Sequence, residues 1–163
     1  MNKLDIERIN IFAPYPIWSK GDVLYFSTVS GVEYSVDFDT DENPYFKAYW
    51  FNLTKLNNKP SQNDVKIPQT IICIIEEFFR QNPDILLYMC SRENDQQAQR
   101  ARLFMRWFNG YEQQQKYMIK STDVRGEGVT EYVALIVQRS HPQLEEISRL
   151  FDEEIAMFNE LKP

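Results

Sequence analysis

Two strand-like runs joined by a tight turn constrain the fold of this chain more than any other feature of its sequence. The runs Val23 to Val29 and Val32 to Phe38 are separated only by Ser30 and Gly31, and glycine supplies the positive φ that a two-residue hairpin requires. In the second run apolar residues alternate with polar ones, Ser35 among them, which predicts one buried and one exposed face. We therefore expect an antiparallel hairpin here.

The rest of the chain alternates between strand-like and helix-like patterns. Apolar residues at every third or fourth position mark helices, and short apolar runs bounded by turn residues mark strands. The order β-β-β-α-β-α-β-β-α predicts an α+β fold with a mostly antiparallel sheet of about six strands. After the first hairpin we expect a strand over Tyr45 to Leu53, a helix from Ile67 to before Asn82-Pro83, a strand buried on both faces over Ile85 to Cys90, a helix to about Asn109, a hairpin of Gln115 to Ser121 with Val129 to Arg139, and a helix opened by Ser140.

The length of 163 residues fits one domain over residues 1–163, since domains typically hold about 100 to 200 residues. Residues 1–22 should form an irregular lead-in, because Pro14 and Pro16 interrupt regular structure. The central part then covers residues 23–139, and the terminal helix covers 140–163. The lead-in should also cover part of the core with its larger apolar side chains, which are Ile11, Phe12, Tyr15, Ile17 and Trp18.

Charge and composition exclude several classes of protein. Lys and Arg number 18 against 24 Asp and Glu, which gives a net charge of -6. Nucleic acids and anionic membranes attract proteins largely through positive charge, so neither is an expected partner. The first residues lack the apolar core of a secretory signal, and no run approaches the roughly 20 apolar residues of a membrane span. Cys73 and Cys90 lack the spacing of a zinc or disulfide framework, so we expect a cytoplasmic protein without a metal site.

One short stretch carries a resemblance to a known family. The segment RARLFMRWF, residues 100–108, looks like the A-x-x-L-Y-x-x-x-G-F helix of the GNAT acetyltransferases. The order of elements over about residues 23–139 also resembles the main part of that fold. The resemblance implies a GNAT-like layout and acetyl-CoA as the cofactor. The whole chain also resembles a bacterial family from Bacteroidetes-type organisms, which carries no known activity.

An acetyltransferase of the GNAT family holds the pyrophosphate of acetyl-CoA with a glycine-rich turn, Q/R-x-x-G-x-G/A, at a helix N-terminus. The matching stretch here is Asn63 to Pro68. Lys66 stands in place of the first glycine, and Pro68 replaces the second small residue and removes an N–H donor. Asp64 adds a repelling negative charge. A single cation on Lys66 does not reproduce a nest of backbone donors.

The family's catalytic tyrosine is also missing from the matching helix. Phe104 stands at its position, and a phenyl ring has no proton to give to a departing thiolate. Tyr88 and Tyr111 are near in sequence, but no pattern directs either to a common site. Asn94 is the counterpart of the family's asparagine, although it comes about one turn too early. The resemblance therefore implies a fold without its usual catalytic groups.

The arginine-rich helix is the remaining candidate for ligand binding. Arg102 and Arg106 are four residues apart and repel each other by about 0.2 to 0.5 kcal/mol if exposed, and Arg92 lies near the start of the same helix. Together with Lys66 and Asn94 they could grip a small anionic ligand such as a phosphate or a carboxylate. The alternative, which we favour, is pairing with the chain's own surplus of Asp and Glu.

Two further patterns are weak. Cys90 precedes a helix N-terminus, where a thiol pKa can fall, and could pair with the lone His141, but the C-x5-R spacing of thiol phosphatases fails at Gln96. A buried structural cysteine is favoured. For His141, a capping role at a helix start is favoured.

The second weak pattern imitates the opening of a calcium loop. Asp37, Asp39 and Asp41 follow the required spacing, but Glu42 stands where the loop needs glycine and Ala48 where it needs a bidentate glutamate. An acidic strand end in contact with solvent is the favoured interpretation.

These observations leave three hypotheses for function. The first is a non-catalytic binding or interaction module without a cofactor, whose partner is a protein or a small anionic ligand. The second is an N-acyltransferase that uses acetyl-CoA in a remodelled site. The third is a homodimer, formed through the aromatic strands or the terminal helix.

Overall fold

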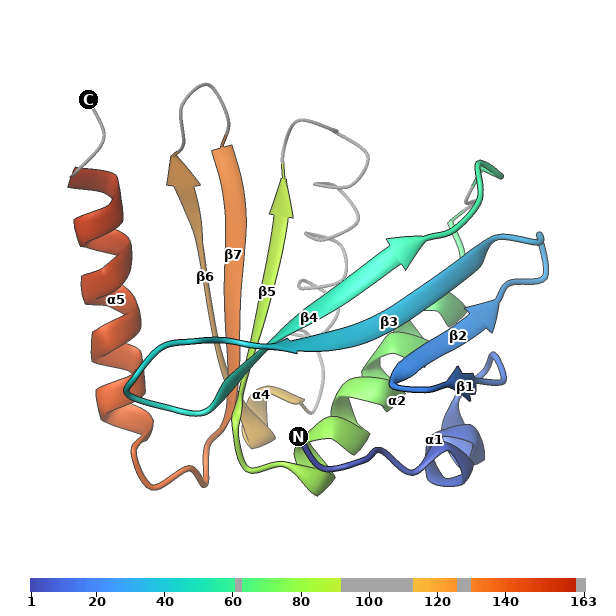
Figure 1. Ribbon diagram of the computed structural model, residues 1–163, viewed down its shortest axis with the longest axis horizontal. Helices are drawn as coiled ribbons and strands as arrows, with labels where there is room; N and C mark the ends of the chain where they lie inside the picture. The colour runs from blue at the N-terminus through green and yellow to red at the C-terminus, as the bar shows by residue number, and fades with distance from the viewer. Residues whose placement is uncertain (61–62, 92–112, 126–129, 161–163) are drawn as a thin grey trace. The chain divides into compact units, whose positions relative to one another are not determined.

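The computed structural model describes residues 1–60, 63–91, 113–125 and 130–160. It is an α+β protein with a mixed, mostly antiparallel sheet of seven strands in the order β1-β2-β3-β4-β5-β7-β6 (Figure 1). None of the described helices is both long and apolar enough to span a bilayer. The elements are α1 Ile6–Phe12, β1 Trp18–Lys20, β2 Val23–Ser27, β3 Glu33–Thr40, β4 Ala48–Lys55, α2 Lys66–Gln81, β5 Ile85–Ser91, α4 Gln113–Lys116, β6 Tyr117–Arg125, β7 Thr130–Gln138 and α5 Leu144–Glu160.

The chain packs as two compact units. The first unit consists of Met1–Asp39 and Phe51–Pro83, and the second consists of Thr40–Trp50 and Asp84–Pro163. Strand β4 contributes residues to both. The expectation of one domain over residues 1–163 stays a prediction.

In the first unit, the hairpin predicted around Ser30 and Gly31 is confirmed. Strands β2 and β3 pair antiparallel, Gly31 has φ of 85°, and the Thr28 N–H donates to the Val32 carbonyl at 2.8 Å. The predicted exposure of Ser35 is wrong, because this residue is buried. Its small side chain lies directly opposite Tyr25 on the neighbouring strand, and a large neighbour at such a position shields a small one.

The prediction of an irregular lead-in over residues 1–22 is wrong, because helix α1 and strand β1 lie within it. The Asp5 carboxylate caps α1 by accepting the Arg8 N–H at 3.2 Å. The amide of Asn10 then bonds both the N–H and the carbonyl of Ile17, at 2.7 and 2.8 Å. This clamp keeps Pro14 in the connection between α1 and β1. Strand β1 can therefore form, and it adds one strand to the six that the sequence predicts.

The side chains of the lead-in are divided between core and solvent. Tyr15 and Ile17 are buried as expected. Ile11, Phe12 and Trp18 do not cover the core, since 68%, 80% and 50% of their surfaces are exposed. Helix α1 is short and buries only Ile9 fully, so the apolar residues of its last turn face solvent.

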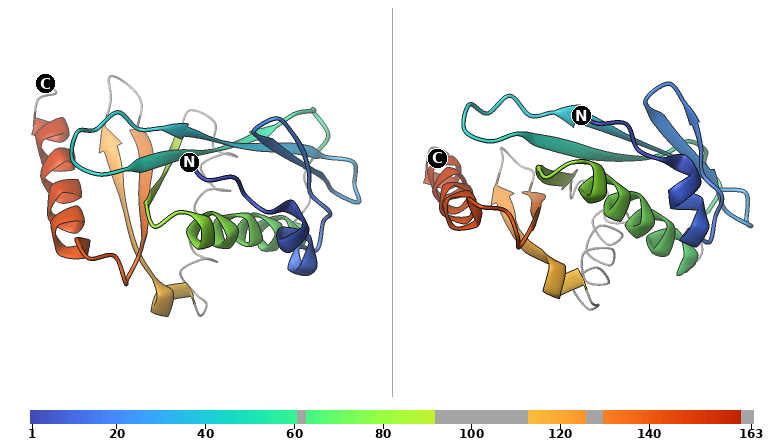
Figure 2. Two further views of the ribbon diagram at one scale, coloured as in Figure 1. Left: turned by 60° about the horizontal axis from the view of Figure 1, so that its bottom comes forward. Right: turned by 90° about the horizontal axis from the view of Figure 1, so that it is seen from below.

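Helix α2 is confirmed and lies across one face of β2 and β3 (Figure 2). Its apolar side chains recur at helical spacing, which gives it one buried face. Phe78 stacks on Phe38 of β3 with ring centroids 5.2 Å apart. The helix ends at Gln81. The N–H of the next residue, Asn82, reaches the Phe78 carbonyl at 2.8 Å, and Pro83, which cannot continue a helix, follows.

A buried carboxylate connects α2 to the start of the chain. Glu77 is fully buried and accepts hydrogen bonds from Arg80 at 2.5 Å, from Gln81 at 2.8 Å and from the Asp5 N–H at 3.3 Å. Burial of a charge is tolerated only when such partners replace water. Glu77 thus fixes the segment before α1 against the last turns of α2.

In the second unit, the predicted hairpin of β6 and β7 is confirmed, with nine antiparallel residue pairs from Tyr117↔Gln138 to Arg125↔Thr130. The turn between them lies outside the described residues. Strand β5 pairs with the other edge of β7. The prediction that β5 is buried on both faces holds for Ile85 and Leu86 and is wrong for Met89, which is 45% exposed.

Helix α5 covers one face of these strands. Ile147 packs in a buried cluster with Ala48, Ile85, Leu135 and Val137. The loop before β4 adds Phe46 to this cluster, and its conformation is held by Asn43, whose side-chain oxygen accepts the Phe46 N–H at 2.8 Å.

Candidate functional site

The N-terminal end of α2 is the site to which the family resemblance points, and all its residues belong to the first unit. The Asp64 carboxylate accepts the Lys66 N–H at 2.9 Å. The Ile67 N–H bonds to the Asp64 carbonyl at 3.1 Å, and the Gln69 N–H bonds to a carbonyl four residues earlier at 3.2 Å. Pro68 has no N–H. From Lys66 to Gln69, every backbone position at this helix start is therefore either paired or without a donor.

Tyr15 closes the site from the connection between α1 and β1. Its hydroxyl donates to the second oxygen of Asp64 and accepts the Val29 N–H at 3.4 Å. The Tyr15 N–H donates to the Thr70 hydroxyl at 3.3 Å. The ammonium of Lys66 lies 5.8 Å from the centre of the Tyr15 ring, within the range of a cation–π contact.

The electrostatic surroundings keep Tyr15 protonated. Burial raises the pKa of its hydroxyl above 10.0, and the hydrogen bond to Asp64 and the negative charge of Asp64 raise this pKa further. The Val29 N–H acts in the opposite direction, but it is outweighed. At neutral pH the phenol is therefore a hydrogen-bond donor and not a base.

The charge and the paired donors at the start of α2 disfavour a bound phosphate. A helix N-terminus attracts an anion through its free N–H groups and its dipole, and here the Asp64 carboxylate already takes that place. A phosphate bound here would lie close to the negative charge of the Asp64 carboxylate, and the repulsion between the two would be strong. Lys66 is exposed and offers one cation beside this carboxylate.

Comparison with known proteins gives the family of the chain. Residues 63–153 match a family of unknown function, DUF6169. This span is more than half of the chain. The protein belongs to the DUF6169 family. No curated protein and no solved structure matches the chain.

The DUF6169 match begins beside Asp64 and contains the whole N-terminal end of α2. Tyr15, which closes the site, lies before the matched span. From the sequence, Tyr15 is expected only in the core, since no local signal links two residues 49 positions apart.

Of the residues predicted to bind an anion, the structure describes only Lys66. Arg92, Asn94, Arg102 and Arg106 lie outside the described residues, as do Phe104 and Tyr111. The anionic ligand and the arginine-rich helix of this DUF6169 protein stay predictions.

His141 has the structural role that the sequence favours. Its Nδ1 accepts the Gln143 N–H at 3.0 Å, one residue before α5 begins. The Cys90 side chain lies outside the described residues, so a pair with His141 stays untested. Cys73 is half-buried on α2, and burial, followed by the charge of Glu76, raises the pKa of its thiol.

The aspartates that imitate a calcium loop serve as hydrogen-bond acceptors. The Asn52 side chain donates to Asp37 and to Asp39, each at 2.7 Å. Asp41, in the second unit, accepts the Trp50 indole N–H at 3.0 Å. Within the described residues there is no group of three potential ligands that could hold a metal ion.

Proposed function

We propose that this DUF6169 protein is a non-catalytic binding or interaction module with a GNAT-like layout. The single observation that carries the proposal is the closure of the α2 N-terminus by Asp64 and Tyr15. At the position where the resemblance implies a pyrophosphate site, the chain supplies its own anion. The order β2, β3, β4, α2, β5, β6, β7 supports this proposal, and the helix expected up to about Asn109 lies outside the described residues.

The competing proposal is an N-acyltransferase that uses acetyl-CoA in a remodelled site. Calorimetric titration of the protein with acetyl-CoA, followed by an acyl-transfer assay on a panel of amines, separates the two. We expect no saturable binding at about 1 mM acetyl-CoA, a limit that corresponds to about -4.1 kcal/mol. Saturable binding together with acyl transfer would overturn our proposal.

A matched pair of variants makes this test sharper. Asp64→Ala removes the negative charge from the helix start, whereas Tyr15→Phe removes one partner of the carboxylate and leaves its charge in place. If Asp64 is what closes the site, only the first variant should gain affinity for inorganic phosphate. Equal phosphate binding by both variants would contradict the role that we give to Asp64.

Large apolar side chains are exposed in the first unit. Phe12 and Ile11 are mostly exposed at the end of α1, and Trp18 is half exposed on β1. Large apolar side chains grouped on a surface often mark contacts with partners. A homodimer formed through them is our second candidate. Sedimentation at several concentrations tests it, and a monomer at every concentration would refute it.

A further inference from the structure

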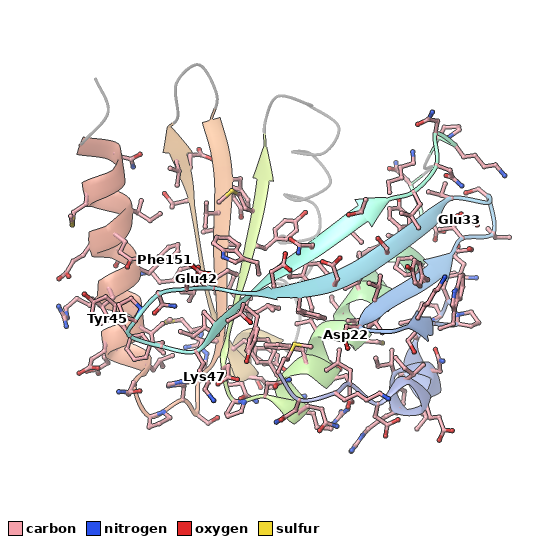
Figure 3. The ribbon with its side chains drawn as sticks, viewed as in Figure 1. Asp22, Glu33, Glu42, Tyr45, Lys47 and Phe151 are labelled. Carbon is pink, nitrogen blue, oxygen red and sulfur yellow. The ribbon has the colours of Figure 1, made fainter. Side chains whose placement is uncertain are left out.

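A small hollow lies between helix α5 and the loop of residues 41–47 that precedes β4, with a free volume of about 70 Å³. All the residues that line it belong to the second unit. Tyr45 on the loop and Phe151 on the helix, both labelled in Figure 3, belong to its two walls. We call this space the loop–α5 hollow.

The interior of the loop–α5 hollow is apolar. Eight of its twelve lining residues are aliphatic or phenylalanine, and four of these are buried in the core, namely Ala48, Ile85, Leu135 and Ile147. Tyr45, in contrast, is 64% exposed, so the hollow leads from solvent into the core. An apolar cavity of about 150 Å³ takes up benzene, so a space of about half that volume takes up roughly three or four carbon atoms.

Hydrogen bonds fix the loop wall of the hollow. The Asn43 side-chain oxygen accepts the N–H groups of Tyr45 and Phe46 at 3.0 and 2.8 Å. Its amide nitrogen donates to the Phe46 carbonyl at 2.9 Å. The Asp41 N–H donates to the Ala48 carbonyl at 2.9 Å. The wall is therefore formed before any ligand arrives, which lowers the entropic cost of binding.

Two carboxylates also line the hollow, Asp41 from the loop and Glu154 from α5. Within the described residues, the donors to the Asp41 carboxylate are neutral. They are the Asn43 amide at 2.7 Å and the Trp50 indole N–H at 3.0 Å, one to each oxygen. A carboxylate oxygen has two lone pairs, so both oxygens of Asp41 can accept a further bond, and the negative charge of Asp41 is not neutralised.

Glu154 is exposed and has no cationic partner in the part of the chain that the structure describes. The one cation of α5, Arg149, pairs with Glu153 at 3.0 Å. The lysine of the loop, Lys47, does not line the hollow. An apolar space bounded by two carboxylates without a cation favours a ligand with an apolar body and a positive head group.

We propose that the loop–α5 hollow binds a small primary amine with a branched alkyl group of about four carbons. The alkyl group fills the space beside Leu150 and Phe151, and the ammonium group donates to Asp41 and Glu154. An alkyl amine is protonated at neutral pH, as a lysine side chain is. The inference goes beyond the function proposed above, because this hollow lies in the other unit and its ligand requires no acetyl-CoA.

Methyl NMR of the full-length protein tests the inference, with 2-methylpropylammonium chloride as the probe. We expect saturable shifts of the methyl signals of Leu87, Leu135 and Leu150, with a Kd of about 1 to 10 mM, an ordinary affinity for a ligand of about five non-hydrogen atoms. The methyl signals of Ile71 and Ile74 on α2 belong to the other unit and should not move. No saturable shift, or equal shifts in both units, would overturn the inference.

Three further probes separate the effects of charge and size. 2-Methylpropan-1-ol keeps the alkyl group without the charge, 3-methylbutanoate reverses the charge, and 2-phenylethylammonium enlarges the apolar group. We expect each to bind at least about tenfold more weakly than 2-methylpropylammonium. Equal binding of the amine and the alcohol would overturn the role of the carboxylates.

A peptide distinguishes a free amine from a chain N-terminus. The amidated tripeptide Leu-Gly-Gly presents a similar alkyl group beside an ammonium group, but it continues into a polypeptide chain. We expect it to bind at least about tenfold more weakly than the free amine, since the hollow holds only about four carbon atoms. Equal or tighter binding of the tripeptide would overturn the assignment to a small amine.

Two variants of α5 with the same change in charge test the position of the ammonium group. Glu154→Gln removes a carboxylate from the hollow, whereas Glu146→Gln removes one that is exposed on the same helix and does not line the hollow. We expect the first variant to weaken binding of 2-methylpropylammonium about fivefold, the effect of an exposed ion pair, and the second less than about twofold. Equal effects would overturn the position.

Ala48→Val tests the position of the alkyl group, because it adds two methyl groups to a residue that lines the hollow. We expect this variant to lose binding of the probe, and thermal unfolding verifies that it is folded. Binding that persists would overturn the position of the alkyl group, and the Glu154 and Glu146 variants decide independently of this result. Failure of the amine to bind refutes only this inference, whereas acetyl-CoA binding with acyl transfer refutes the proposed function.

Discussion

The Tyr15 hydroxyl donates a hydrogen bond to the carboxylate of Asp64, 49 residues further along the chain. This contact joins the connection between α1 and β1 to the first turn of α2, all within the first unit. It also directs a charged group of the protein to the end of a helix where a ligand would otherwise find donors. The same two side chains thus stabilise the fold and place a carboxylate at the start of α2.

Replacement of Tyr15 by Phe should lower the free energy of unfolding by about 1 to 2 kcal/mol, because Asp64 loses a donor and the Val29 N–H loses its acceptor. Urea denaturation at pH 7 measures the change. Tyr25→Phe is the control, since the hydroxyl of Tyr25 has no partner among the described residues. An equal loss in the two variants would contradict the role of the Tyr15 hydroxyl.

The stabilising effect of Tyr15 should depend on pH in the alkaline range. Because the pKa of Tyr15 is raised in the folded protein above its ordinary value of 10.0, the folded state keeps a proton that the unfolded chain loses. This contribution is complete below pH 10 and declines as the pH rises through the raised pKa. The difference in stability between the wild-type protein and Tyr15→Phe should therefore shrink above pH 10. A difference that grows there would show that the pKa is shifted in the other direction.

Removal of the Glu77 side chain should destabilise the protein by about 2 to 3 kcal/mol, since three donors lose a charged acceptor in a buried position. We expect Glu77→Ala to show this loss in thermal or urea unfolding. Glu153→Ala, which breaks the exposed pair with Arg149, should change stability by less than about 1 kcal/mol. Similar losses of stability in the two variants would mean that the burial of Glu77 does not strengthen its contribution to stability.

Replacement of the glycines at positive φ should cost similar amounts at both positions. Gly21 has φ of 61° and open space where a Cβ would lie, whereas a Cβ on Gly31, with φ of 85°, would lie 2.7 Å from the Lys59 ammonium nitrogen. The end of a lysine side chain moves easily, so backbone strain of about 1 to 2 kcal/mol should dominate in Gly21→Ala and in Gly31→Ala. A much larger loss for Gly31→Ala, restored by Lys59→Ala, would show that the contact with Lys59 matters more.

Alkylation of Cys73 should be slow at neutral pH. Burial and the negative charge of Glu76 raise the pKa of its thiol above 9.0, and only the thiolate reacts. The rate of iodoacetamide labelling, followed on the Cys73 peptide by mass spectrometry, should rise with pH to beyond pH 9. Labelling that reaches its maximal rate below pH 9 would be inconsistent with the raised pKa.

The parts of the fold that the sequence predicts are those with a local cause. The hairpin at Gly31 follows from a turn residue, and α2 follows from apolar spacing and from Pro83 at its end. Helix α1 and strand β1 were missed because Pro14 and Pro16 indicate irregular structure, while the clamp that organises them is a pair of hydrogen bonds from one side chain, Asn10.

The position of the candidate site could be predicted from the sequence, but the hydrogen bonds that close it could not. The residue types at Lys66 and Pro68 already indicate a poor phosphate site. The carboxylate of Asp64 was expected to repel an anion, but its direct capping of the helix depends on a backbone conformation that the sequence does not reveal. The bond from Tyr15 arises only when the chain folds back on itself, so no periodicity or spacing could have indicated it.

The pairing of β5 with β7 sets the order in which the second unit can assemble. β6 and β7 are neighbours in sequence, and isolated hairpins form in about 1 to 10 μs. Leu86 of β5 instead pairs with Ile136 of β7, which requires the closure of a loop of about 50 residues before any bond between these two strands is gained. The hairpin should thus exist as a template before β5 joins it, and the arrival of β5 should limit the folding rate of the second unit.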